Sequence, residues 1–349
     1  MPSTEQTPFL NVRPRISIDG AERANLGEAA LALQIHLPRS GMAHAELRLL
    51  NWGPTESGQP DFLFQSLRLG SRLEIRLGEG SDPAAFAGEI TAIEERYGDG
   101  APQLVLLAED ALHRLARQRH NRVFEDMRLD DVIQQIAGEA GLQGDVSVAG
   151  GSATWLQVNE SNLAFLLRQL AHYDVSLRLH EGRLRVRDEE SDPQPVQLDP
   201  GSARHIRLVA DLNRLPTDVT VQGYDLAADS AVSSRHDQLS PAPAGESGTA
   251  LLSQLGWAGS SILPHPFTRS QQEAEELAGR QFRQRAQRFL HGEIVCAGNA
   301  RLRSGSEVEL RQVSPRLVGR YRVLECWHQF DTAQGLRTRI RVHRPDWSR

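Results

Sequence analysis

Lysine is missing from this chain altogether: all 39 basic residues among its 349 are arginine. A G+C-rich genome produces this usage, and so does a need for planar, bidentate donors at interfaces; we favour the genome. The formal net charge is −6. Arginines alternate with acids along most predicted strands, so no basic stripe follows the spacing of phosphates, and the sequence does not support nucleic-acid specificity.

Cysteine is nearly as scarce. Cys296 and Cys326 are the only two, and nothing around them has the spacing of metal ligands. A chain of this length does not depend on a single disulfide for its stability. We expect both thiols to be small, buried, apolar groups on strands.

Long apolar runs and targeting signals are also lacking. The N-terminus, Met1 to Glu5, has neither a positive start nor an apolar stretch, which excludes a secretory signal. No run approaches the roughly 18 apolar residues of a spanning helix. We therefore expect a protein that folds in the cytoplasm and does not insert into a membrane.

Motifs that carry chemistry are missing as well. The chain has no Gly-Xaa-Ser-Xaa-Gly elbow, no phosphate-binding glycine loop and no carboxylate pair that stands out from the surface background. The twelve histidines come nearest to clustering at His113 with His120 and at His328 with His343. We expect these to be surface or boundary residues rather than metal ligands. The sequence predicts no catalytic residue, metal or cofactor, and no enzyme.

What the sequence does contain is an internal echo. Residues 69–107 and 302–342 both read as strand, loop, strand, turn, strand, and in both a glycine precedes a glutamate by six residues. Any β-meander with a glycine at a bulge gives a similar pattern. Type, order and spacing agree together, so we favour a duplicated β-module and expect Gly88 and Gly319 at equivalent positions. Three such chains in a ring would present six similar units.

The hydrophobic period divides the chain into several units. The sequence predicts an α+β, mainly β fold with two similar antiparallel β-barrel domains. We assign residues 1–117 to the first barrel, and 199–226 with 293–349 to the second. Residues 118–198 form a small α+β domain with two helices and a hairpin, and 227–292 form an insertion with a long loop and a helix.

Helix signals are clear at three places. Apolar residues from Leu129 to Ala140 mark one helix face that stops at Gly141. A second helix begins after Asn159 or Ser161, either of which can cap it. Ser270 and Glu273 fit a capping box, and the helix that they open is expected to end at Gly292. Its late arginines (Arg280, Arg283, Arg285, Arg288) suit an acidic partner or a solvated helix end, and we favour the latter.

Several local signatures together resemble the phage late control D family, which includes the baseplate hub of contractile tails and the hub half of VgrG-type proteins. They are Ala45–Gly53, Phe86–Ile90, Leu107–Leu112, Val123–Phe124 leading into Leu129–Ile133, Trp155–Leu166 and Arg185–Asp188. No single one is specific, but their order along the chain is.

This resemblance implies a structural hub subunit of a contractile injection machine. Family members form a trimeric, pseudo-sixfold ring that adapts a hexameric tail tube to a trimeric spike. VgrG-type chains continue into an oligonucleotide-binding-fold domain and a needle, whereas this one stops at Arg349, so we expect a separate spike protein. Other implied partners are the tail tube protein, further baseplate components and a tape measure protein. The alternative is a tail-tip cell-wall hydrolase or carbohydrate-binding module.

Candidate interface residues follow from the strand pattern. Charged residues alternate with apolar ones on the two echoed strands, so one face of each is charged. We expect Leu73, Ile75, Val308 and Leu310 to fill the barrels. The charged faces are expected to border the channel or the tube contact, unless they merely face solvent; they carry Arg72, Glu74, Arg76, Glu307, Glu309 and Arg311.

Overall fold

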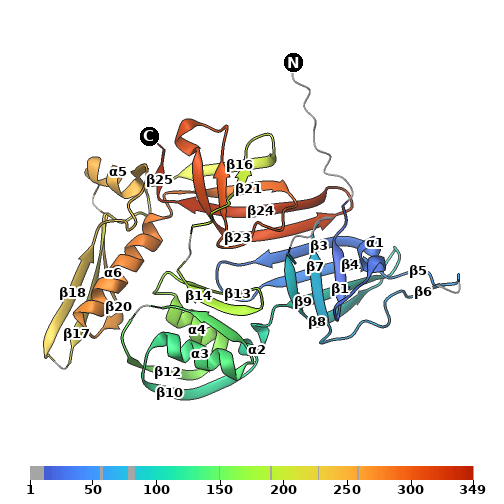
Figure 1. The fold of residues 1–349 in the computed structure, drawn as a ribbon, viewed down its shortest axis with the longest axis horizontal. Coiled ribbons are helices and arrows are strands. Elements are labelled where there is room, and N and C mark those ends of the chain that lie inside the picture. The colour runs from blue at the N-terminus through green and yellow to red at the C-terminus, as the bar shows by residue number, and fades with distance from the viewer. Residues whose placement is uncertain are drawn as a thin grey trace.

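A computed structural model describes residues 12–55, 58–77, 83–148, 150–188, 191–226, 228–257 and 259–348. Strands dominate, and apart from the short α1 (Ala24–Ala29) the helices lie in the middle third of the chain and in one later segment (Figure 1). The predicted α+β, mainly β class is confirmed. No described helix has the length and apolarity that crossing a membrane requires.

One sheet runs through both echoed regions. Its first half has the order β3 (Ala30–Leu37), β4 (His44–Leu50), β9 (Gln103–Glu109), β8 (Phe86–Arg96) and β7 (Arg72–Arg76), followed by β1 (Arg15–Ile18) and β2 (Ala21–Glu22). Its second half has the order β16 (Ala203–Ala210), β21 (Leu290–Ala297), β24 (Gly335–Arg344), β23 (Gly319–Asp331) and β22 (Glu307–Leu310), followed by β15 (Val196–Leu198). The halves join where β23 pairs with β3, and in Figure 1 the red half lies above the blue one. We call these halves the first and second modules.

The two modules repeat five strands in the same antiparallel order. In each, a glycine with positive φ (Gly70 at 83°, Gly305 at 86°) donates its N–H across to the long strand, at 2.8 Å from the oxygen of Ile90 or Val323. The long strand then carries a bulge directly after that residue in both modules. The outermost strands differ, because β1 runs antiparallel to β7 whereas β15 runs parallel to β22.

The expected equivalence of Gly88 and Gly319 is wrong by two residues. Gly88 lies opposite Leu73, the position that Tyr321 occupies in the second module, and Gly319 lies opposite Leu310. Each glycine has its own steric cause. A Cβ at Gly88 would lie 2.3 Å from the Glu109 carbonyl oxygen, whereas Gly319 has a φ of 130° and lies against a guanidinium.

Each module has its own buried cluster, but no hydrogen-bonded ladder closes either one into a barrel within the described residues. The first cluster is centred on Ile35, Leu47 and Ile75, and the second on Ile294, Val323 and Ile340. Phe330 of β23 packs into the first cluster, so the second module completes the core of the first.

The small unit between the modules contains β10 (Arg119–Met127), α3 (Leu129–Glu139), β11 (Gln143–Val146), β12 (Ala153–Ser161), α4 (Asn162–Leu170) and the hairpin β13 (Ser176–His180) with β14 (Arg183–Arg187). The predicted helix ends are confirmed: Gly141 has a φ of 70°, and the Ser161 hydroxyl caps α4 by accepting from the Ala164 N–H at 3.2 Å. The predicted hairpin is present as well. The pair β10–β12 and the short α2 (His113–Ala116) are additional.

The later segment forms a separate layer at the left of Figure 1, where β17 (Asp218–Asp225), β18 (Ser230–His236) and β20 (Ser260–Thr268) pack on α6 (Gln271–Ala286). Assigning residues 199–226 entirely to the second barrel is therefore wrong, because β17 pairs with β18 and β20. The long loop predicted within residues 227–292 is also wrong where β18 forms and where α5 (Gly248–Gln254) begins. β18 has little apolar content and is ordered by its hairpin partner β17 and by α6, whereas α5 is anchored by Leu251 and Leu252, which pack on the second cluster.

The last predicted helix also ends earlier than expected. Ser270 caps α6 as predicted, accepting from the Glu273 N–H at 3.2 Å. The helix stops at Ala286, and Gly292 lies inside β21. A Cβ there would lie 1.9 Å from the Arg207 carbonyl oxygen, so this glycine serves the close approach of two strands. The remaining described elements are α1 (Ala24–Ala29), the pairs β5 (Gly53–Pro54) with β6 (Pro60–Asp61) and β19 (Glu246–Ser247) with β25 (Asp346–Trp347), and the 3-10 turn Pro315–Leu317.

Candidate assembly surfaces

The two charged strands present the alternation that the sequence predicts. Leu73, Ile75, Val308 and Leu310 are fully buried, and they belong to the clusters of their own modules. This confirms that the apolar faces fill the modules. Their charged neighbours lie on the opposite faces of β7 and β22, where the structure gives them two different surroundings.

On β7, the charged residues line a cleft. Arg72, Glu74 and Arg76 border a cavity of about 530 Å³ that also reaches the β13–β14 turn and the loop at Arg303. Glu74 forms an ion pair with Arg76 at 2.7 Å. This face of the first module therefore looks toward the small unit and the second module.

On β22, one of the three residues is buried. Glu307 lies 2.8 Å from the Arg322 guanidinium and 3.7 Å from that of Arg320, and its carboxylate also accepts the Asp192 N–H. Glu309 and Arg311 pair with each other at 2.9 Å on the exposed side. The structure thus does not bring the six candidates together. Only the cross-strand register reveals that Glu307 faces Arg322.

The cleft contains a buried carboxyl group, Asp110. Burial raises its pKa to about 7, while the N–H groups of Ala43 and Leu112 oppose that shift by donating to its two oxygens at 2.9 and 3.0 Å. Both oxygens are thus engaged in holding the starts of β4 and α2 together. A glycosidase needs a free acid beside a second carboxylate, whereas both oxygens of Asp110 accept backbone N–H groups.

The sequence predicts the burial of the cysteines correctly but not that of three histidines. His113, His328 and His343 are buried rather than at the surface, so the expectation for these three is wrong. Burial lowers the pKa of His328 to about 4 and that of His343 to about 3. Cys296 and Cys326 are buried on β21 and β23, as predicted. Among the described residues, no three His, Cys, Asp or Glu side chains group as metal ligands.

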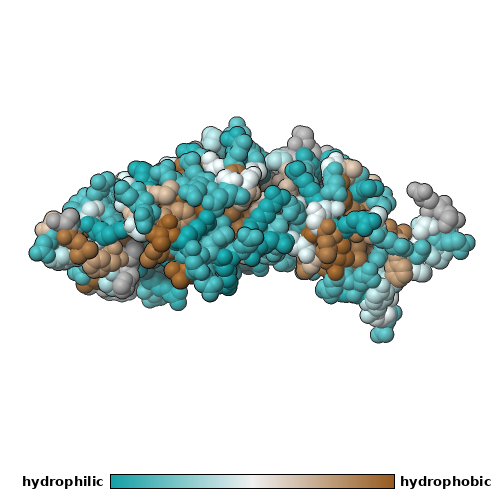
Figure 2. All heavy atoms as spheres, turned by 90° about the horizontal axis from the view of Figure 1, so that it is seen from below, coloured by the Kyte–Doolittle hydropathy of each residue, from teal (hydrophilic) through white to brown (hydrophobic). Residues whose placement is uncertain are grey.

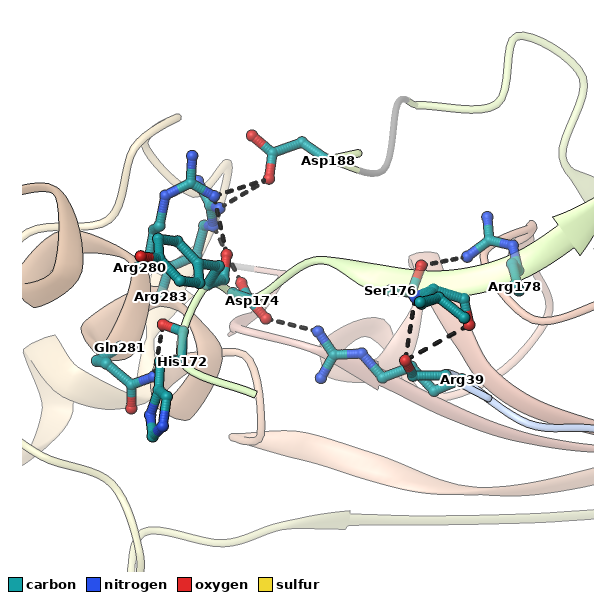
Figure 3. A network of polar contacts seen from close by, with 12 residues as sticks. Arg39, His172, Asp174, Ser176, Arg178, Asp188, Arg280, Gln281 and Arg283 are labelled. Carbon is teal, nitrogen blue, oxygen red and sulfur yellow. Dashed lines mark hydrogen bonds and ion pairs between the residues drawn. The ribbon is translucent and has the colours of Figure 1, made fainter. Parts of the chain in front are cut away.

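A polar network joins three parts of the chain (Figure 3). The buried Asp174 carboxylate, after α4, lies 2.5 Å from Arg39 of the β3–β4 loop and 3.2 Å from Arg283 of α6. Arg283 also pairs with Asp188 at 3.3 Å. Arg280 donates to the Tyr173 carbonyl oxygen at 2.8 Å. Arg280, which also lies 3.4 Å from Asp188, and Arg283 thus have acidic partners within the chain, and the interpretation as a solvated helix end is wrong for these two.

Apolar surface is confined to separate patches on a largely hydrophilic face (Figure 2). On the small unit, Val123 of β10 lies opposite Leu156 of β12, and both are more than half exposed. On the first module, Tyr97 follows β8 and contacts Phe62 edge-on, with 64% of its surface exposed.

One comparison with known proteins identifies a family, and another shows the fold in solved structures. A family model for the phage tail baseplate hub (GPD) matches residues 40–334. The fold is similar to a 43 kDa tail protein of prophage MuSo2 from Shewanella oneidensis (TM-score 0.71, 14% identity, covering 96% of this chain and 99% of that one). It is also similar to a tail protein from Neisseria meningitidis (0.67, 11% identity, 97% and 98%).

A more distant likeness reaches type VI secretion. An Escherichia coli component of that system gives a TM-score of 0.53 at 12% identity, covering 95% of this chain and 76% of that one. No curated protein matches the chain. Since these identities are low, the solved structures show a shared fold, and the family model carries the assignment. The chain belongs to the phage tail baseplate hub family.

Proposed function

We propose that this hub protein forms a trimeric ring in which the two modules of each chain alternate, giving six similar units around a channel. Such a ring adapts a sixfold tail tube on one side to a threefold spike on the other. The main support for this proposal is that five strands recur in the same order in both modules. Three chains, each with two equivalent units, provide six units that can meet a sixfold partner. The partners are the tail tube protein, a spike protein, other baseplate components and a tape measure protein.

The candidate interface is divided between two surfaces. Arg72, Glu74 and Arg76 line the cleft, and we propose that a tail partner reaches them there. Glu309 and Arg311 lie on the exposed side of β22 and suit a contact with the tube or the channel. Glu307 is already neutralised inside the chain and contributes to the shape of this strand instead.

Mass in solution tests the ring. Light scattering on the purified chain should give a trimer, or a monomer that becomes a trimer when the spike protein is added. Co-purification with the tube protein then tests the adaptor role. A stable dimer would count against the proposed function.

A further inference from the structure

The joint between the modules uses one edge of each, and leaves the matching edge of each unused. At the joint, β23 residues Cys326 to Asp331 pair antiparallel with β3 residues Leu37 to Ala32. Beyond Ile90, β8 has a described strand neighbour only on its β9 side, and β16 has one only on its β21 side. Open edges of this kind template pairing with another strand.

The unused edges are the counterparts of the joined ones. Ile90 of β8 corresponds to Val323 of β23, because both receive the glycine N–H and both precede the bulge. β16 corresponds to β3, because β3 pairs with β4 just as β16 pairs with β21. Both strands also have a register shift at the same place, between Ala30 and Ala32 in β3 and between Ala203 and His205 in β16. The cross-strand pairs of the two modules can be matched residue by residue, and in this match Val209 of β16 is the counterpart of His36 of β3.

We propose that β8 of one copy pairs antiparallel with β16 of the next copy, repeating the β23–β3 joint between chains. The inference rests on the proposed ring and names its interface. The register of the joint, carried over, puts Glu95 opposite Leu208, Arg96 opposite Arg207 and Tyr97 opposite Ile206. Backbone hydrogen bonds of an added strand supply the affinity, and the alternating side chains supply the register.

The burial of residues at the joint, compared with the exposure of their counterparts at the unused edges, supports a second copy as the partner. Phe330, which pairs with Leu33 at the joint, is 4% exposed and completes the core of the first module. Its counterpart Tyr97 is 64% exposed. Ile206 and Leu208 already face the second cluster and remain half-buried. Pairing would place the Tyr97 ring beside Ile206, as Phe330 is placed beside Leu33.

Charge also fits a second copy. Glu94 is exposed and holds Arg96 in a two-bond ion pair at 2.7 and 3.0 Å. In the proposed register Arg207 lies opposite Arg96 and diagonal to Glu94, within reach of long side chains across a strand pair. The Glu94 carboxylate would then lie between the guanidinium groups of Arg96 and Arg207 and would reduce the repulsion between them.

The contact is head to tail. It uses β8 of one chain and β16 of the other, so repetition builds either a closed ring or an open filament. Within one chain the two strands are separated by six others in the sheet order and lie apart in Figure 1. A link between them therefore reports a contact between copies.

Cysteine trapping tests the pairing. The double variant Arg96→Cys with Arg207→Cys, oxidised and run on a non-reducing denaturing gel, should give covalent dimers and trimers with no larger product. Gln329→Cys with Gln34→Cys is the matched control, since these two exposed side chains occupy the same positions at the joint within one chain and hydrogen-bond at 3.4 Å. It should close within the monomer. Each single variant should give no trimer.

The outcomes separate the interface from the function. Monomer alone, while the control pair closes, would overturn the pairing; so would a ladder that stops at another size or continues without limit. A trimer by light scattering that does not cross-link would reject this interface and leave the proposed ring intact. A cross-linked trimer that binds neither spike nor tube would keep the interface and reject the adaptor function.

Discussion

At the scale of single residues, the buried Asp174 holds three parts of the chain together. Its side chain is 3% exposed and faces Arg39 and Arg283, which are about a third exposed. Replacing Asp174 by Asn keeps the shape and tolerates the φ of 52° at this position, but leaves two partly buried guanidinium groups without their shared charge. We expect urea unfolding to show a loss of about 2 kcal/mol, below the range for a fully buried pair because solvent screens both arginines. Asp188→Asn is the control, since that carboxylate is 56% exposed and should change stability little.

His328 predicts a pH dependence of stability. Burial, and to a lesser extent Arg303, lowers the pKa of His328 to about 4, whereas an unfolded histidine titrates near 6.5. Between those values the unfolded chain binds a proton that the folded chain does not, so stability is full above about pH 6.5 and falls as the pH drops toward 4. In His328→Asn the free energy of unfolding should fall less steeply, by up to about 1.4 kcal/mol per pH unit. His343 and Asp110 titrate in both proteins and cancel in this difference.

Urea unfolding at several pH values between 4 and 7 checks this expectation. The exposed His205 offers the control, and His205→Asn should follow the wild-type curve. Parallel curves for His328→Asn and the wild type would show that this histidine is already protonated in the fold.

At the scale of elements, helix caps could be predicted from the sequence, whereas the strands and side chains that pair across the fold could not. Ser161 and Ser270 mark helix starts because a hydroxyl three residues before a free N–H is a local feature. The strand β18 follows no such rule: Ser230–His236 has a weak strand pattern and is ordered by β17 on one edge and by α6 on its face. For the same reason the burial of Glu307 escaped prediction, since its partner Arg322 comes from another strand.

The repeat itself predicts that equivalent glycines respond alike. Gly70 and Gly305 share a positive φ near 85° and make the same cross-strand hydrogen bond. Alanine at either should cost about 1 kcal/mol, because a Cβ disfavours the left-handed conformation. Gly100→Ala is the control, because nothing lies within 4 Å of a Cβ there and its φ is not positive. Paired urea denaturation curves check the prediction, and a large cost at only one of the two positions would contradict their equivalence.

At the scale of the whole molecule, the two charged strands are not interchangeable, although the sequence treats them as copies. Glu74 lines the cleft beside Arg72 and Arg76, whereas Glu309 stands on the outside of the second module with Arg311. Reversing a charge at a contact that fixes register repels the partner, while reversal on a solvated face costs little. Glu74→Arg and Glu309→Arg should each lower the yield of assembled, contraction-competent particles in a complementation assay. The exposed Asp237, which follows β18 in the separate layer, supplies the matched control as Asp237→Arg. If the charges of β7 and β22 only face bulk solvent, all three variants will assemble and contract as the wild type does, and the candidate interface will have to be sought on other strands.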